Sequence, residues 1–189
     1  MSPEIIEAVY RYSEIYSEPL MLIASKNQID WDGGYVNNWT TSAYVAYAGS
    51  MKQKYPKAKV YLCRDHCGPG FKNDDLKDTY KTLDDDINNG FDVIHIDFCH
   101  FIGSYEEKLE ASSKAILYSL EKNPNLIIEI GTDENKGDFL SGTSNIEKEI
   151  QFFQAIAPIH FFVCQTGSLI KEVNQVGGFN QEFLKQTKQ

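Results

Sequence analysis

Five short runs rich in β-branched and aromatic residues recur along this chain at a nearly constant interval. They begin at residues 20, 59, 92, 126 and 160, so successive starts lie 39, 33, 34 and 34 residues apart. This interval leaves room for one helix between successive runs, and alternation of strand and helix predicts a parallel sheet covered by helices. The five predicted strands are Leu20–Ala24, Lys59–Cys63, Asp92–Asp97, Leu126–Ile130 and His160–Cys164.

The segments around these runs carry apolar residues at helical spacing, which predicts amphipathic helices with one face against the sheet. The chain also opens with a helical pattern, in which Ser2 is suited to cap the helix and Pro3 to its first turn. Asn145 is a plausible cap for the last of the helices. The predicted helices after the opening one are Thr41–Tyr55, Asp75–Asn89, Tyr105–Lys122 and Asn145–Ala157.

A parallel sheet of this kind is either an open doubly wound sheet or a closed barrel, and the spacing does not separate the two. A complete (β/α)8 TIM barrel takes about 250 residues, whereas this chain has 189 residues and five visible strands. No Pro- or Ser-rich linker interrupts the chain. The sequence therefore favours an α/β fold with a single domain over residues 1–189, with about five parallel strands and outer helices, either as an open sheet or as an incomplete (β/α)8 TIM barrel.

Composition excludes several classes of partner. The formal net charge is -9 and the isoelectric point is near 4.9, so we expect no nucleic-acid partner, because phosphate backbones are bound by clustered Lys and Arg. No run approaches the roughly 18 apolar residues of a membrane helix, and the first twenty residues lack the basic and apolar regions of a secretory signal. We expect a cytoplasmic protein, no membrane association, and cysteines that stay reduced.

Polar residues gather directly after the predicted strands, where ligands bind in both parallel architectures. The most informative segment is VYLCRDHCGPG, in which an apolar strand ends on Asp65 and His66. Asp65 can act as a general acid or base, and His66 as a metal ligand. The competing interpretation is that Asp65 caps the following turn and His66 is an ordinary polar residue at the edge; the residues alone do not decide between them.

Carboxylates also occur inside or just after the later strands. Glu129 lies within an apolar run, where an unpaired carboxylate is costly, so we expect it to face a polar barrel mouth. The alternative is an ion pair with Arg64 or Lys26. Asp97 ends its strand with the same ambiguity, and the interpretation favoured for His95 and His160 is that they are packed or edge residues.

Glycine pairs offer a further candidate feature. Gly33 and Gly34 lack Cβ atoms, so a phosphate can approach their backbone amides closely. The pattern is weak, because it is neither a P-loop nor a dinucleotide-binding fingerprint.

Taken in order, the segments ASKNQIDWDGGY, RDHCGPG, GFDVIHIDFCH, IEIGTDENKG and FFVCQTG resemble the family of class II D-tagatose-1,6-bisphosphate aldolase "non-catalytic" subunits. The family pattern reads S-N-Q-x-x-x-x-G-G-Y, G-D-H-x-G-P, G-F-x-x-I-H-L-D, I-G-T-E and V-x-Q-P-G. The resemblance spans nearly the whole chain. It implies a TIM barrel in the class II aldolase neighbourhood, where a zinc ion stabilises an enediolate and an acidic residue moves protons.

The resemblance also implies roles for individual residues. It makes Asp65 the acid/base, His66 a ligand of zinc or another divalent cation, and Glu129 a second catalytic carboxylate near the metal. The residues implied to contact substrate are Asn27, Gln28, Gly33, Gly34, Asp97, Asp133 and Gln165.

The chain departs from the family pattern in several places. Lys26 lies inside the first motif, Asp133 stands where the family has Glu, and Thr166 where it has Pro. The family's first strand would precede the opening helix, and its last strands, with further metal histidines, would follow Gln165. We therefore expect a partial barrel domain with a weak metal site.

Two functions follow from the resemblance. The first is a metal-dependent lyase acting on a phosphorylated sugar, of the ketose-bisphosphate aldolase type, or a ketose-phosphate 4-epimerase that works by retro-aldol chemistry. The second is a non-catalytic partner that stabilises the catalytic subunit of a class II aldolase, with a homo-oligomer as another form of assembly.

Overall fold

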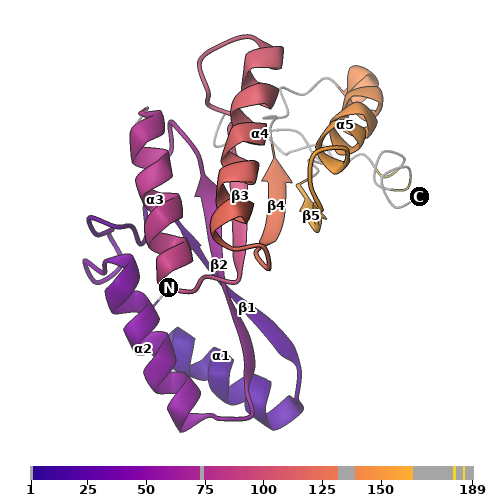
Figure 1. The fold of residues 1–189 in the computed structure, drawn as a ribbon. Helices are drawn as coiled ribbons and strands as arrows, with labels where there is room; N and C mark the ends of the chain where they lie inside the picture. The colour runs from indigo at the N-terminus through magenta and orange to yellow at the C-terminus, as the bar shows by residue number, and fades with distance from the viewer. Residues whose placement is uncertain (1, 73–74, 132–138, 164–180, 182–184, 186–189) are drawn as a thin grey trace, which may run out of the picture.

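The computed structural model of the chain describes residues 2–72, 75–131, 139–163, 181 and 185. Its five strands form one parallel sheet in the order β1-β2-β3-β4-β5, and helices alternate with them along the chain (Figure 1). The alternation predicted from the five runs is confirmed. The elements are α1 Pro3–Tyr16, β1 Pro19–Ser25, α2 Thr41–Lys54, β2 Lys59–Cys67, α3 Leu76–Asn88, β3 Val93–Asp97, α4 Tyr105–Lys122, β4 Ile127–Gly131, α5 Phe139–Gln154 and β5 Phe161–Phe162.

Local sequence explains where several helices begin. The Ser2 hydroxyl accepts a hydrogen bond from the Ile5 amide at the start of α1. Ser104 and Glu107 form a reciprocal capping box at the start of α4. The predicted start of the last helix was wrong: α5 begins six residues before Asn145, at Phe139.

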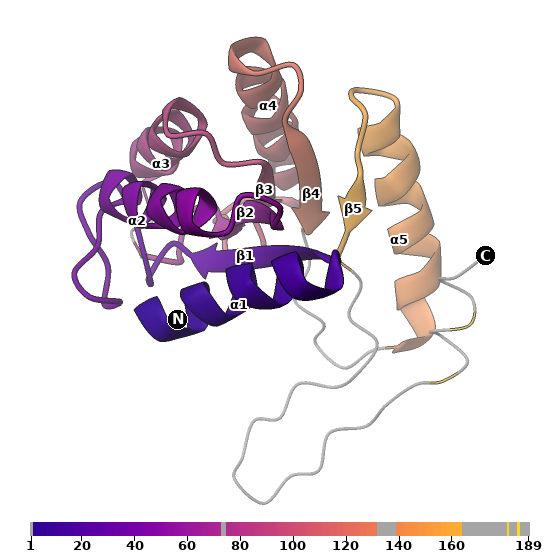
Figure 2. The ribbon, with the colours of Figure 1, turned by 90° about the horizontal axis from the view of Figure 1, so that it is seen from below.

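All five helices lie on the outer side of a curved sheet, following one another around it in Figure 2. Every connection joins neighbouring strands in chain order, and right-handed crossovers that keep moving in one direction place the connecting helices α2 to α5 on the same face. The helix α1 precedes β1 and packs into the same apolar cluster as α2. A doubly wound sheet would instead reverse its strand order and carry helices on both faces. The described strands do neither, which supports the barrel-type winding over the doubly wound alternative.

The helix-facing side of the sheet is packed with apolar residues in two clusters. One cluster lies between α1, α2 and the first two strands and includes Tyr10, Leu22 and Tyr44. The other lies between α3, α4, α5 and the later strands and includes Ile94, Ile116 and Phe153. These two clusters hold the helices against the sheet and so fix the strand ends that carry the site.

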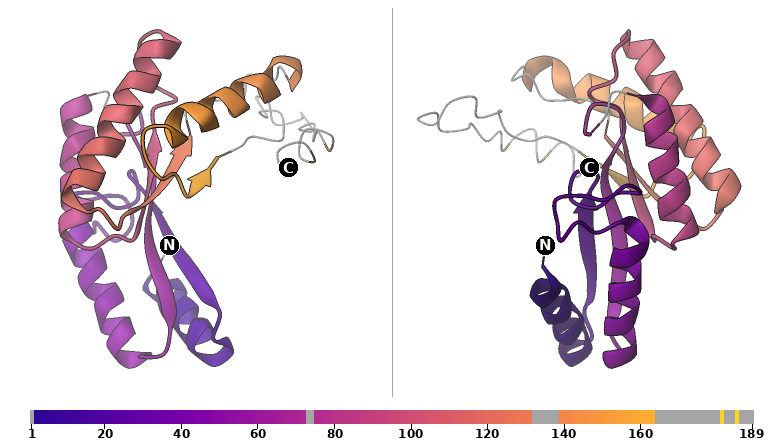
Figure 3. Two further views of the ribbon diagram at one scale, coloured as in Figure 1. Left: turned by 45° about the vertical axis from the view of Figure 1, so that its right-hand side comes forward. Right: turned by 90° about the vertical axis from the view of Figure 1, so that its left-hand side faces the viewer.

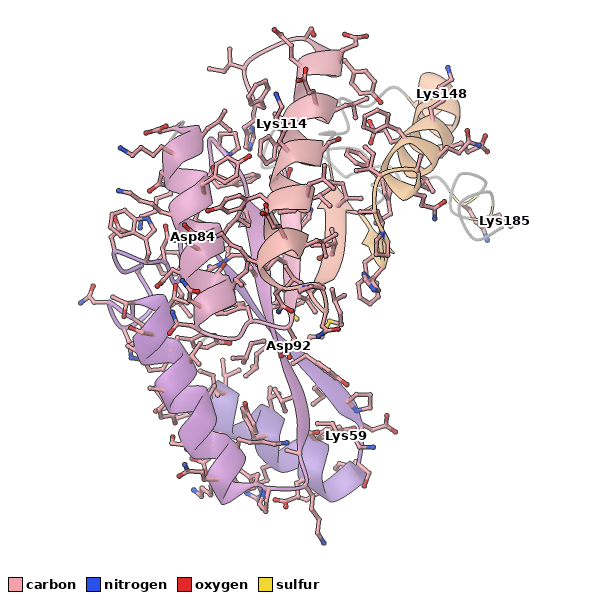
Figure 4. The ribbon with its side chains drawn as sticks, in the orientation of Figure 1. Lys59, Asp84, Asp92, Lys114, Lys148 and Lys185 are labelled. Atoms are coloured by element: carbon pink, nitrogen blue, oxygen red, sulfur yellow. The ribbon has the colours of Figure 1, made fainter. Side chains whose placement is uncertain are left out.

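Polar contacts join neighbouring helices on the outer layer. The Asp84 carboxylate of α3, labelled in Figure 4, accepts a hydrogen bond from the Tyr118 hydroxyl of α4 at 2.7 Å. Lys122 of α4 lies 3.0 Å from the same carboxylate. These two contacts join α3 to α4 in the helical layer that covers β2 and β3.

Figure 3 shows α2, α3 and α4 as one layer along the strands, and the inner face of the sheet is turned away from that layer. Its apolar side chains are correspondingly exposed, including Ile23 at 53% and Phe161 at 44%. Among the described residues the sheet is not closed, with β1 and β5 at its two edges. The five parallel strands and outer helices are thus observed, whereas a complete eight-stranded barrel is not.

Within the described residues, no helix combines the length and apolar character needed to cross a membrane. Among the described residues, Cys63, Cys67 and Cys99 take part in no disulfide, and the reduced state expected for the cysteines stays a prediction. Cys164 lies outside the described residues.

Candidate metal centre

The strand register brings one polar residue from each of four strands into a row across the inner face. Ser25 pairs with Asp65 between β1 and β2, and His95 pairs with Glu129 between β3 and β4. All four residues lie at or near the carboxyl ends of their strands. This is the edge at which parallel sheets bind their ligands.

A β-bulge in β2 places two side chains opposite one residue of β3. Arg64 pairs with Ile94 and Cys67 with Ile96, so Asp65 and His66 together face His95. At this bulge the backbone of His66 adopts a left-handed conformation with a φ of 53°. A non-glycine residue is uncommon there and stores strain, and bulges of this kind often redirect side chains next to functional sites.

The bulge gathers three potential metal ligands. One donor atom each from Asp65, His66 and His95 lie within 4.8 Å of one another. The Asp65 carboxylate lies between the two rings, with Oδ1 3.3 Å from His95 Nδ1 and Oδ2 3.5 Å from His66 Nε2. These three residues can therefore hold a metal ion.

The charges of the cluster reinforce one another. Burial opposes ionisation of Asp65, but the hydrogen bond from His95 and the charge of His66 outweigh it and lower the pKa of the carboxyl. The hydrogen bond to Asp97 raises the pKa of His66. An ionised carboxylate and two imidazoles together form a suitable ligand set for a divalent cation.

His95 is the member that sequence reasoning missed, because it was interpreted as a packed strand residue unsuited to metal binding. It is buried, with 4% of its side chain exposed, but its ring faces Asp65 rather than an apolar core. Its Nε2 is buried with no hydrogen-bond partner in the described chain. The available signal was the alternation of β3, which places His95 on the same face as Asp97.

Glu129 is half-buried next to His95 in the register. The ion pairs considered for it are not formed, because Arg64 pairs with Asp86 at 2.7 Å and Lys26 with Asp78 at 2.5 Å. Within the described residues no hydrogen bond or ion pair is recorded for the Glu129 carboxylate, so it remains available to a ligand. The register thus places Glu129 beside His95, and its catalytic role stays a prediction.

Four predicted substrate contacts lie in the loop after β1. Asn27 is exposed, whereas the Gln28 side chain accepts a hydrogen bond from the Ser25 amide at 2.9 Å. The amides of Gly33 and Gly34 donate to Asp30 and Trp39 oxygens. A Cβ atom at Gly34 would lie 2.1 Å from the Gln28 oxygen, so this glycine permits a close approach within the loop itself. Their role in substrate binding stays a prediction.

Of the three remaining residues predicted to contact substrate, one lies beside the cluster and two lie outside the described residues. Asp97 lies next to His66, with Oδ2 2.7 Å from His66 Nδ1. Asp133 and Gln165 lie outside the described residues.

The donor set fits a divalent cation on chemical grounds. Two imidazoles and one carboxylate are the protein ligands of many catalytic zinc sites, which leave a further position for substrate or water. The carboxylate of Asp97 lies 2.7 Å from His66 Nδ1, where metal-binding histidines usually have a hydrogen-bond partner. The chain matches no model of a known protein family, so the case for function rests on this site and on the motifs.

Proposed function

We propose that this chain is a divalent-cation-dependent enzyme acting on phosphorylated ketoses, as a retro-aldol lyase or as a 4-epimerase of the same chemistry, on a sector of a (β/α)8 barrel. The observation that carries the proposal is the convergence of Asp65, His66 and His95 at the carboxyl ends of β2 and β3. The order and content of the five motifs support the substrate class. Zinc is the cation that the resemblance favours.

Residues of the chain divide the work of the proposed reaction. Asp65, His66 and His95 hold the cation, which when bound supplies a Lewis acid that polarises the ketose carbonyl. Cleavage requires removal of a proton from the hydroxyl group beyond the breaking carbon–carbon bond. The electron pair of that bond passes to the carbonyl side, and the resulting carbanion equivalent must then be protonated on carbon.

Two carboxylates are candidates for moving these protons. Both Asp65 oxygens face imidazoles, which commits this carboxylate to the cation. Glu129 lies beside the cluster on the same inner face, with no recorded partner in the described chain. We therefore assign proton transfer to Glu129 and cation binding to Asp65, and retain acid/base action by Asp65 as the alternative.

Paired amide substitutions test the proposal. In the zinc-loaded protein with ketose phosphates, Glu129→Gln should retain zinc and lose at least about 100-fold in turnover, as expected for loss of a general acid or base. Asp65→Asn should lose both zinc and turnover. If Asp65→Asn keeps full zinc and loses only turnover, Asp65 is the acid/base; if zinc-loaded wild type cleaves and epimerises no phosphorylated ketose, the enzymatic proposal fails.

The second candidate function, a non-catalytic partner of a class II aldolase subunit, is favoured by the exposed inner face. Met21, Ile23, Tyr61, Phe161 and Val163 are each at least 40% exposed there, and large apolar patches often mark interaction surfaces. If the wild-type chain is inactive but raises the activity or the melting temperature of a class II catalytic subunit, this function is preferred.

A further inference from the structure

His66 is held from two sides. Its ring stacks on Phe71 with centroids 4.5 Å apart, and its Nδ1 lies 2.7 Å from Oδ2 of Asp97. These contacts offset the strain of the left-handed backbone at His66 and leave Nε2 directed to the side of Asp65.

Asp97 is engaged on both carboxylate oxygens. Oδ2 contacts the His66 ring, and Oδ1 accepts a hydrogen bond from the Cys99 amide at 3.0 Å. The side chain is only 6% exposed. An ionised carboxylate only accepts hydrogen bonds, so the group that faces it must donate.

We propose that Asp97 is a positioning residue, which keeps the His66 proton on Nδ1 and leaves the lone pair of Nε2 free to bind the cation. This inference rests on the proposed function, since a free lone pair on Nε2 of His66 matters only if the protein binds a cation there. It replaces substrate contact as the role of Asp97.

An amide cannot substitute for this carboxylate. Asparagine offers one oxygen and one NH2 group, whereas the Cys99 amide and His66 Nδ1–H both require an acceptor. If the asparagine oxygen accepts from Cys99, its NH2 group faces Nδ1 and moves the ring proton to Nε2, which blocks cation binding. If it turns the other way, the NH2 group faces the Cys99 amide, and two donors oppose each other.

The first test reads the tautomer directly, without metal. Imidazole ¹⁵N shifts of the full chain, measured at a pH where His66 is neutral, should show the proton on Nδ1 in wild type. Asp97→Asn should raise the population protonated on Nε2. A wild-type His66 protonated on Nε2 overturns the inference even if no Asp97 variant folds.

The second test measures zinc affinity by calorimetry. Loss of a residue that supports a metal ligand typically weakens binding about 10- to 100-fold, and we expect this loss for Asp97→Asn and Asp97→Ala. Asp84→Asn is the matched control, because the Asp84 carboxylate likewise contacts two donors, the Tyr118 hydroxyl and the Lys122 ammonium, but lies on α3.

The two tests separate this inference from the proposed function. Unchanged zinc affinity in folded Asp97 variants overturns the positioning role and leaves the metal site standing. A wild-type chain that binds no zinc, yet holds the His66 proton on Nδ1, contradicts the metal-dependent function and confirms the tautomer.

Discussion

His95 shows how a buried histidine gains a role from its neighbours. On the sequence it is an apolar-run residue flanked by Ile94 and Ile96, and such histidines are more often packed than functional. The structure places its Nδ1 3.3 Å from Asp65 Oδ1. What the one-dimensional pattern lacked was the bulge that brings Asp65 and His66 opposite the same position.

Removing the His95 ring should therefore weaken the metal site. A catalytic zinc site usually has three protein ligands, so His95→Ala should lower zinc affinity by about 10-fold or more. Because His95 is buried, the variant is also expected to lose some stability. His160→Ala is the control, since the His160 ring accepts a hydrogen bond from the Ile128 amide and is not part of the three-residue cluster. Equal zinc affinity in both variants would mean that His95 is no ligand.

Arg64 illustrates the opposite case, a charged strand residue whose role is structural. It is fully buried, pairs with Asp86, and donates to the Ala24 and Ile29 carbonyl oxygens. It therefore joins β2 to α3 and to the loop that carries the first motif. The residue types alone left open a pairing of Arg64 with Glu129, although strand alternation places Arg64 on the face opposite to that of its neighbour Asp65.

Breaking this buried pair should be severe. Asp86→Ala leaves the guanidinium of Arg64 buried without its carboxylate, which typically costs about 3–5 kcal/mol. Urea denaturation should show that loss, whereas Asp84→Ala on the same helix, at an exposed ion pair, should cost about 1 kcal/mol or less. Similar losses in the free energy of unfolding of the two variants would show that the Arg64–Asp86 pair contributes no more to stability than the exposed pair.

At the level of elements, hydrophobic periodicity predicted most of the fold. The helix Tyr105–Lys122 was predicted with the bounds that α4 has, and α2 and α3 differ from prediction only at their ends. Periodicity failed at β2, which was expected to end at Cys63 and continues to Cys67. Strand patterns assume strict alternation, so a bulge that carries two polar residues is read as the start of a loop.

Two glycines give a matched pair of tests on the elements. A Cβ atom at Gly131 in β4 would lie 2.7 Å from His95 Nε2, so Gly131→Ala should displace the buried ring and weaken zinc binding. Gly49 lies within α2 with open space around its position. Gly49→Ala should raise the free energy of unfolding by about 0.5–1 kcal/mol without affecting zinc.

Calorimetry and thermal unfolding check both glycine variants. Unchanged zinc affinity in Gly131→Ala would show that the ring can shift without loss of its ligand atom. A destabilised Gly49→Ala would show that this part of α2 is more crowded than the structure indicates.

For the whole molecule, the winding of the sheet follows from the sequence but its closure does not. Strand–helix repetition dictates parallel strands, and sequential strand order then puts every helix on one face. Closure depends on how many strands complete the curve. The exposed inner-face side chains Ile23 and Phe161 show that this face of the described chain has no internal cover.

Cation binding at the metal site should stabilise the whole chain. The ligands come from two strands, with Asp65 and His66 on β2 and His95 on β3, so the complete site exists only when the sheet is formed. A cation that binds only the folded chain adds about 2.7 kcal/mol at 100 times its dissociation constant. For a chain of this size that corresponds to a rise in melting temperature of roughly 5–11 °C, and a chelator should reverse it.

The acidic surface can also attract cations weakly, so the variant His66→Ala/His95→Ala is the necessary comparison. A rise that persists in this variant places the cation elsewhere, and a wild-type melting temperature unchanged by zinc, cobalt and manganese would contradict the metal centre itself.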